Sequence, residues 1–162
     1  MTFLLFIRHG IAEPYLSAEL DAERALTPEG WAQTRLAMKG LIGRGFLPNR
    51  GISSPYRRAM ESMACLKETV AEGFPVGVWE GLEPEGDIVQ AEVWLRRLMI
   101  GAQEDEIIAF TSHQPFLGDL VHHLTGRTVD VKNACCTVVE WVGSGWSFKA
   151  HFSPAQLRGE AP

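Results

Sequence analysis

The chain has 162 residues, 46% of them hydrophobic and 22% charged, and its 15 Lys and Arg against 20 Asp and Glu give a formal net charge of −5. At about 150 residues per domain, this length predicts a single domain over residues 1–162 that needs no disulfide or metal to support its core. The acidic balance argues against a general binder of nucleic acid or of membrane surfaces.

The three cysteines are Cys65, Cys135 and Cys136. An odd number, with two of the residues adjacent, does not suit a disulfide framework and predicts buried free thiols in a reducing compartment. The apolar run over residues 3–7 is too short for the core of a signal peptide or for a membrane span. We therefore expect a cytoplasmic protein.

The first half of the chain alternates apolar runs with helical patterns. Residues 3–7 are continuously apolar, as in a strand buried on both faces, and the polar stretch 11–26 predicts a loop or lid with room for one short helix. Thr27 and Pro28 are typical of a helix start, and that helix should end near Gly43. A short strand over 50–54 and a helix starting at residue 55 should follow.

The second half continues the alternation and ends with two strands. A short strand is expected at 75–79, then a helix capped by Asp87, a buried strand at 106–111 and a helix after Pro115. Two strands should flank the turn at 143–145. This order predicts an α/β fold: a three-layer α/β/α sandwich whose central sheet is mostly parallel and ends in an antiparallel C-terminal strand or hairpin.

Histidines and arginines follow three of the predicted strands. Arg8-His9-Gly10 follows the first strand, Arg57 and Arg58 follow the second, and His113 follows the strand at 106–111. Sites in open α/β sheets form at the carboxyl ends of the strands, so these side chains should meet at one rim.

Such a cluster suits phosphoryl transfer. Neighbouring arginines depress the pKa of an imidazole and keep it neutral and nucleophilic near pH 7. Arginines also bind phosphate and balance the charge of a phosphoryl transition state. A second histidine can donate to the same oxygens, and Gly10 would let a ligand approach the backbone closely. A covalent phosphohistidine intermediate is then the expected chemistry.

Four motifs resemble the histidine phosphatase (phosphoglycerate mutase-like) superfamily. They are Arg8-His9-Gly10, Leu26-Thr27-x-x-Gly30, Ser53-Ser54-Pro55-x-x-Arg58-Ala59 and Ser112-His113. The short chain and the stretches 82–87 and 152–157 look like the SixA-type phosphohistidine phosphatase branch. The resemblance spans about residues 3–157.

The resemblance implies a role for each matching residue. His9 would be the nucleophile, and Arg8, Arg58 and His113 would hold the phosphoryl group, with Gly10 and Gln114 as further substrate-binding residues. The proline spacing of the motif selects Arg58 over Arg57. No cofactor and no metal is implied. Ser54 and Thr27 are interpreted as turn or cap residues.

The motifs do not identify the general acid, and the residue after Gly10 departs from the pattern of the superfamily. An alkyl phosphate ester needs a proton donor for its leaving group, and Glu83 and Glu85 are possible acids, although we favour a solvated acidic loop as their interpretation. A phosphohistidine substrate needs such an acid less, because imidazole is a good leaving group. Ile11 stands where relatives often carry a polar or acidic residue, which would make the pocket rim more apolar.

We therefore expect a phosphatase in signal transduction that removes phosphate from phosphohistidine on a phosphotransfer domain. Its partners would be a phosphorylated protein or a small phosphoester, with no nucleic acid and no membrane, and the oligomeric state is left open. The alternatives are a phosphatase of small phosphoesters, a non-catalytic phosphate-recognition module on the same fold, and a metallohydrolase using His9 and His113. Neighbouring arginines argue against the last.

Overall fold

The computed structural model describes residues 1–160. It contains six strands and five helices: β1 (Thr2–Arg8), α1 (Pro28–Gly43), β2 (Arg50–Ser53), α2 (Arg57–Thr69), β3 (Val76–Val78), α3 (Ile88–Ile100), β4 (Ile107–Ser112), α4 (Phe116–Thr125), β5 (Cys136–Trp141), β6 (Trp146–Phe152) and α5 (Pro154–Leu157). Short 3-10 turns lie at Asp21–Glu23 and Glu80–Leu82. Residues 161 and 162, the end of the expected domain, lie outside the described residues.

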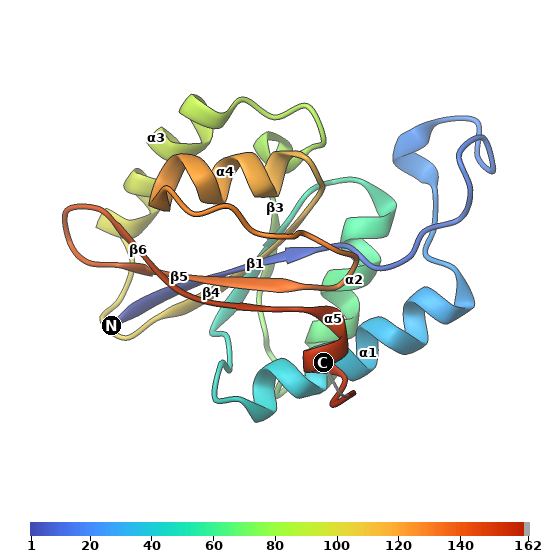
Figure 1. Cartoon of the computed structure of the whole chain (residues 1–162), viewed down its shortest axis with the longest axis horizontal. Coiled ribbons are helices and arrows are strands. Elements are labelled where there is room, and N and C mark those ends of the chain that lie inside the picture. The colour runs from blue at the N-terminus through green and yellow to red at the C-terminus, as the bar shows by residue number, and fades with distance from the viewer. Residues whose placement is uncertain (161–162) are drawn as a thin grey trace.

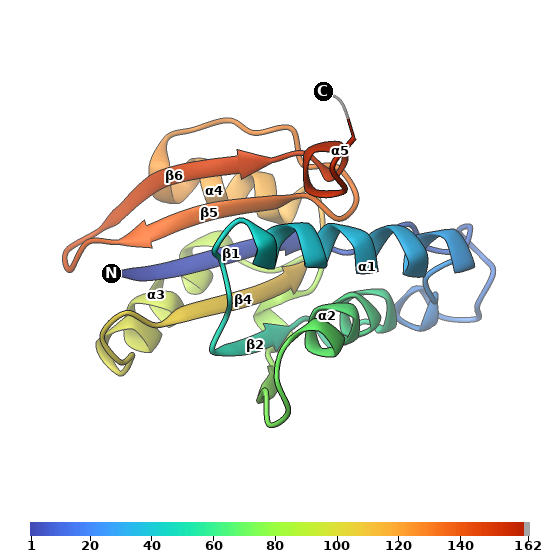
Figure 2. The same ribbon diagram turned by 90° about the horizontal axis from the view of Figure 1, so that it is seen from below.

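The strands form one sheet in the order β3-β2-β4-β1-β5-β6 (Figures 1 and 2). β3, β2, β4 and β1 pair in parallel, whereas β5 pairs antiparallel with both β1 and β6. Helices α3 and α4 cover one face, and α1, α2 and α5 cover the other. The predicted three-layer α/β/α sandwich with an antiparallel C-terminal hairpin is therefore confirmed.

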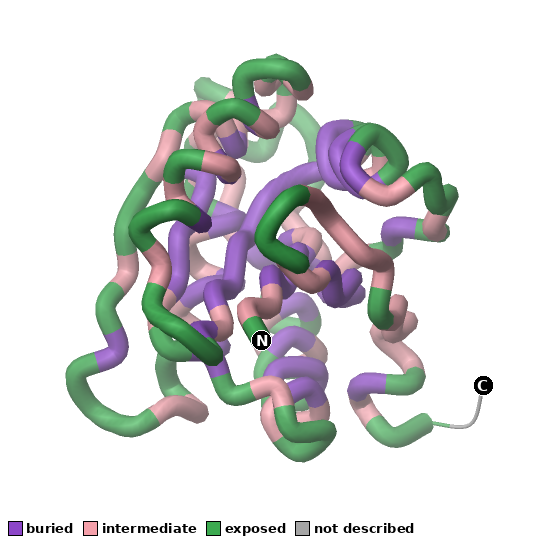
Figure 3. Tube along the Cα trace, turned by 90° about the vertical axis from the view of Figure 1, so that its left-hand side faces the viewer, coloured by how far each residue is buried: buried purple, intermediate pink, exposed green. Residues whose placement is uncertain are grey.

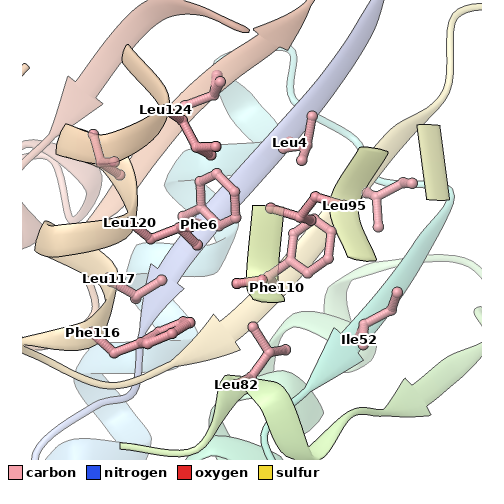
Figure 4. Packing of buried hydrophobic residues seen from close by; sticks show 14 of the residues in the cluster. Leu4, Phe6, Ile52, Leu82, Leu95, Phe110, Phe116, Leu117, Leu120 and Leu124 are labelled. Carbon is pink, nitrogen blue, oxygen red and sulfur yellow. The ribbon is translucent and has the colours of Figure 1, made fainter. Parts of the chain in front are cut away.

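Two apolar clusters hold the layers together, one on each face of the sheet. Side chains alternate along a strand, so Leu4 and Phe6 of β1 enter the cluster beneath α3 and α4, while Leu5 and Ile7 enter the opposite cluster. Phe6 stacks on Phe110 of β4 with ring centroids 5.3 Å apart (Figure 4). Buried segments lie in the interior of the trace, and exposed segments surround them (Figure 3). This packing explains the unbroken apolar run of the first strand.

The helix starts follow the predicted capping signals, with one exception. The Thr27 side chain accepts a hydrogen bond from the Gly30 amide, and the Asp87 side chain accepts one from Gln90. The second helix begins at Arg57 rather than at the expected Pro55. Tyr56 is the N-cap and has an extended conformation (ψ 138°), so the proline lies in the preceding turn.

The short helix α5 was not expected from the sequence. Ser153 and Gln156 form a reciprocal capping box, and Pro154 occupies the first turn. The Ser-x-x-Gln spacing, which is a known N-terminal signal, could have revealed it. The three cysteines are free and buried, as predicted. Within residues 1–160, no helix is long and apolar enough to cross a membrane.

Candidate active site

The parallel pairing of β1 and β4 brings the two motif histidines together. Arg8 is in register with Ser112, and the His9 amide donates to the Ser112 carbonyl at 3.1 Å. The next residue of each strand end is a histidine, and the His9 and His113 rings lie 5.2 Å apart. β2, on the other side of β4, leads into α2 and supplies Arg58. The sequence-based expectation of one shared rim is correct.

His9 is held as a neutral imidazole with a defined tautomer. Its ring is buried, and Nδ1 lies 2.7 Å from the Gly10 carbonyl oxygen, which can only accept. The proton therefore sits on Nδ1, and Nε2 carries the lone pair that can attack an electrophile. Arg58 Nε donates to that Nε2 at 3.3 Å. Burial, followed by the charges of Arg58 and Arg8, lowers the His9 pKa to about 3 despite the opposing hydrogen bond to Gly10.

Arg58, rather than Arg57, enters the site. Arg58 is only 4% exposed, and its two terminal nitrogens donate to the backbone oxygen and the carboxylate of Asp21, at 2.8 and 3.1 Å. Arg57 is exposed and pairs with Glu61 one turn along the helix. Asp21 also accepts from Arg24 at 2.7 Å. Burial opposes ionisation of Asp21, but these two arginines outweigh it and lower its pKa.

Arg8 and His113 each present a buried nitrogen that has no protein partner within residues 1–160. Arg8 donates through Nη1 to the Val131 carbonyl at 3.1 Å, while its Nε is unpaired. The His113 ring is 1% exposed, with Nε2 2.8 Å from Ser54 Oγ and Nδ1 unpaired. Buried polar groups normally have hydrogen-bond partners. Two unpaired nitrogens at a cationic site fit a receptor for an anion.

The tautomer of His113 follows from the contact with Ser54. Ser54 Oγ accepts from the Tyr56 amide at 3.2 Å, and among the described residues its own hydroxyl proton has His113 Nε2 as its one acceptor, at 2.8 Å. The imidazole proton is then on Nδ1, where it can be donated to a ligand. Burial, then the repulsion that a protonated His9 would exert, and then the charge of Arg58 lower the His113 pKa to about 2, so this ring is also neutral.

These groups surround a pocket of about 280 Å³. It is lined by Arg8, His9, Ile11, Ala12, Arg24, Arg58, Pro84, His113, Gln114 and Asn133. Three of the lining side chains are guanidinium groups, and none of the described lining residues is a carboxylate. A phosphoryl group and the atoms directly attached to it suit a space of this size and charge. We call this space the phosphate pocket.

Gly10 has a different role from the one expected. It does not line the phosphate pocket, and a Cβ placed on it would lie 2.1 Å from Thr34 Oγ1 and 3.2 Å from the Gly30 carbonyl oxygen, both in α1. The glycine is therefore required for close packing of β1 against α1. Its backbone also serves the site, because its oxygen fixes the His9 ring. Gln114 does line the pocket, and its side chain also accepts from the Gly118 amide.

The two possible acids lie in a neighbouring hollow rather than in the phosphate pocket. Glu83 and Glu85 line a space of about 270 Å³ together with Tyr56, Glu80 and Gly86. Tyr56 lines this hollow and also contacts the site, with its ring edge-on to His113 at a centroid distance of 5.2 Å, and Pro84, between the two glutamates, lines the phosphate pocket. Burial, and then the charge of Glu83, raises the Tyr56 pKa. We call this space the acidic hollow.

Four site residues were missed or undervalued in the sequence. Asp21 and Arg24 belong to the segment expected to be a loop or lid, and Asn133 precedes β5 and donates to the backbone oxygens of His9 and Gly10. Ser54 was interpreted as a turn residue; it does cap Tyr56, but it also contacts His113. The only signal for Asp21 and Arg24 was an i,i+3 charge pair in a polar segment, and Asn133 gave none.

Within residues 1–160, no three His, Cys, Asp or Glu side chains gather as ligands that could hold a metal ion. The charges that surround the phosphate pocket are cationic, so the donor set matches an anion better than a cation.

The chain is similar in sequence and in structure to known proteins. No protein-family model matches the chain. An uncharacterized protein from Picosynechococcus sp. is 30% identical over 135 residues, which are 81% of this chain and 80% of the relative. The solved structure of the protein histidine phosphatase SixA complexed with tungstate is 27% identical, with a TM-score of 0.85 over 96% of this chain and 99% of that one.

More distant structures share the fold. A phosphoserine phosphatase from Entamoeba histolytica, bound to phosphoserine, is 16% identical with a TM-score of 0.68 and covers 95% of this chain and 98% of its own. A mycobacterial glucosyl-3-phosphoglycerate phosphatase is 17% identical with a TM-score of 0.71, covering 91% of this chain and 97% of its own. The chain belongs to the SixA-type branch of the histidine phosphatase superfamily and is a phosphatase.

Proposed function

We propose that this phosphatase hydrolyses phosphohistidine on a signalling protein, such as a phosphotransfer domain, through a covalent intermediate on His9. The observation that carries the proposal is a pocket with a neutral His9, three guanidinium groups and no carboxylate among its described lining residues. Such a pocket binds and transfers a phosphoryl group but offers no obvious proton donor to a leaving group. The similarity to the SixA structure supports the same substrate class.

The first step is in-line attack of His9 Nε2 on phosphorus. The new N–P bond forms as the bond to the substrate imidazole breaks, and the electron pair of that bond stays on the departing nitrogen. When the other nitrogen of the substrate ring carries a proton, the leaving group is neutral imidazole and no proton transfer is needed. Arg8, Arg58 and the Nδ1–H of His113 would stabilise the equatorial oxygens.

The second step is hydrolysis of phosphorylated His9. Throughout both steps Nδ1 keeps its proton, which is donated to the Gly10 carbonyl oxygen. Water attacks phosphorus, the N–P bond breaks, and its electron pair returns to Nε2. The products are neutral His9 and dihydrogen phosphate, so charge and protons balance without an external acid or base. The metal-free chemistry expected from the sequence is part of this proposal.

Small phosphoesters are the second candidate substrates. Glu83 and Glu85 flank Pro84, which lines the phosphate pocket, and a shift of this segment toward the pocket could supply the acid that an alkoxide leaving group needs. A purely phosphate-recognising module is less consistent with the site, because a binding role does not require an unprotonated Nε2 facing the anion site.

A substrate panel tests the proposal. The kcat/KM values of a phosphohistidine peptide, a phosphoserine peptide and a sugar phosphate should be compared for the wild type, Glu83→Gln and Glu85→Gln. We expect the phosphohistidine peptide to be preferred by a hundredfold or more, since general acid catalysis contributes about 10²–10⁴-fold to ester cleavage. Neither variant should affect phosphohistidine turnover. An equal or greater activity on an ester, lost in one of the glutamine variants, would establish the second candidate instead.

A further inference from the structure

Charged groups are ordered along the edge of the sheet that carries the site. The parallel strands β3, β2, β4 and β1 end at this edge, and the antiparallel β5 begins there. Residues after β3 form the acidic hollow, the middle strands form the phosphate pocket, and residues beside β5 and β6 form a third hollow. The phosphate pocket therefore lies between two surfaces of different charge.

The third hollow, which we call the cationic trough, adjoins the phosphate pocket. It has a volume of about 310 Å³ and is lined by Arg8, Ile11, Gln33, Lys132, Asn133, Pro154 and Arg158. Arg8, Ile11 and Asn133 line both spaces. A protein segment whose phosphohistidine enters the phosphate pocket would thus have its neighbouring side chains close to the trough.

The trough carries cations whose acidic partners lie outside it. Lys132 is 64% exposed and its contact with Asp130, at 3.5 Å, is too exposed to fix either side chain strongly. Arg158 is 17% exposed and pairs with Glu160 at 2.6 Å. No carboxylate is found among the described residues that line the trough. Arg8 adds a third cation where the trough meets the phosphate pocket.

The opposite side of the phosphate pocket has the reverse charge. Glu80, Glu83 and Glu85 line the acidic hollow, and no cation is found among its described lining residues. A partner bearing carboxylates would be repelled on this side and attracted on the trough side. The two surfaces together would orient a charged partner in one direction across the site.

We propose that the cationic trough binds acidic side chains that lie beside the phosphohistidine of the partner protein. The proposal rests on the proposed function and names the surface charge of its substrate. The partner places carboxylates toward Lys132 and Arg158 and leaves the side facing Glu83 neutral or basic. The trough contributes recognition, while the phosphate pocket performs the chemistry.

Three phosphohistidine peptides provide the test. They share one helical sequence and differ in two positions one turn from the phosphohistidine, which hold Asp, Lys or Ala. The readout is the ratio of kcat/KM for the Asp and Lys peptides, because a ratio cancels any change in the chemical step. The variants are Lys132→Glu and Arg158→Gln, with Lys39→Glu as the matched control, since this exposed lysine of α1 lines none of the three hollows.

The wild type should prefer the Asp peptide by about three- to tenfold, a range typical of partly exposed ion pairs. Lys132→Glu should abolish or reverse this preference, Arg158→Gln should weaken it, and Lys39→Glu should leave it intact. The preference should also shrink at high ionic strength. If the Asp-to-Lys ratio of kcat/KM were the same in the wild type and in Lys132→Glu, the trough proposal would be overturned. Turnover of the Ala peptide in the same experiment would still support the phosphohistidine activity. No turnover of any peptide would contradict that activity, and the trough proposal with it.

Discussion

The two histidines of the site depend on single acceptor and donor atoms for their chemistry. The Gly10 carbonyl oxygen fixes the His9 proton on Nδ1, and the Ser54 hydroxyl does the same for His113. The second nitrogen of the His113 ring has no partner in the described chain, and that of His9 accepts only the 3.3 Å contact from Arg58 Nε, which a phosphoryl group would displace. The reactivity of His9 therefore depends on backbone geometry, and that of His113 depends on one side chain 59 positions away in the sequence.

Ser54 should behave as a positioning residue. Ser54→Ala removes the donor to His113 Nε2, and we expect kcat to fall about tenfold or more, as the loss of a buried hydrogen bond of about 1.4 kcal/mol implies. Ser54→Thr, which keeps the hydroxyl, should recover much of the activity. Ser53→Ala is the matched control, since that buried hydroxyl bonds Thr111 and the Ser54 carbonyl but not His113. Wild-type kcat in Ser54→Ala would refute the role.

The buried neutral histidines predict how stability depends on pH. Both rings have a pKa well below the usual 6.5, about 3 for His9 and about 2 for His113, chiefly because of burial. Below pH 6.5 the unfolded chain binds protons that the folded chain does not, so the free energy of unfolding should fall by about 1.4 kcal/mol per pH unit for each histidine. This contribution is fully present above pH 6.5.

Urea denaturation between pH 7 and pH 4 would measure this dependence. His113→Gln should reduce the slope by about 1.4 kcal/mol per pH unit relative to the wild type, because glutamine does not titrate. His122→Gln is a suitable control on the exposed part of α4. If the slope were the same in all three proteins, His113 would not be a buried neutral ring.

Some residues of the site could be predicted from the sequence and others could not. Arg8, His9, Arg58 and His113 follow predicted strands, so topology alone brings them together. Asp21, Arg24 and Asn133 lie outside the strands and α-helices, in connections whose path depends on tertiary contacts. The contact of Ser54 with His113 joins two strand ends and has no local pattern. Motifs therefore predicted the reacting groups but not the residues that orient them.

At the scale of elements, the packing of β1 against α1 places the nucleophile. Gly10 follows His9 directly and faces Thr34 and Gly30 of α1, with no space for a methyl group. The Gly10 amide also donates to Ser62 of α2 at 2.9 Å. Two helices therefore fix the turn that carries His9. Helix starts and strands were predictable here because caps and apolar runs are local, whereas this close approach is not.

Gly10→Ala should destabilise the protein by about 1–3 kcal/mol through overpacking. Thr34→Ala alone should cost little, because Thr34 Oγ1 is buried without a hydrogen-bond partner in the described chain. The double variant should recover at least about 1 kcal/mol of the loss, since the closest contact disappears. Urea unfolding of the wild type, the two single variants and the double variant forms a double-mutant cycle. Strictly additive changes in the free energy of unfolding would show that the contact with Thr34 is not the cause of the destabilisation.

At the scale of the whole molecule, one sheet joins every part of the chain to the site. β1 is central and packs into both apolar clusters, and α5 lies against α1, where a Cβ on Gly40 would meet the Leu157 carbonyl oxygen. The N-terminal amine also pairs with Asp105 beside β4. The alternation of elements predicted this layered fold, but the strand order and the charge order along the site edge required the structure.

The expected single domain over residues 1–162 should unfold as one cooperative unit. Far-UV circular dichroism reports the helices and strands. Tryptophan fluorescence reports both faces of the sheet, because the stacked Trp79 and Trp94 pack on the α3 side and Trp31 packs on the α1 side. The two urea transitions should coincide, because neither face of the sheet can lose its cover without exposing β1. Separate midpoints would indicate two independently folding parts.

The central claim is that His9 Nε2 receives the phosphoryl group. Wild-type protein should be mixed with a phosphohistidine peptide, quenched at alkaline pH within milliseconds and analysed by mass spectrometry after proteolysis, with His9→Ala as the control. The mechanism predicts phosphate on Nε2 of His9 that is stable to base and labile to acid, and turnover that is abolished in His9→Ala. Phosphate on another residue, or near-wild-type turnover by His9→Ala, would contradict it.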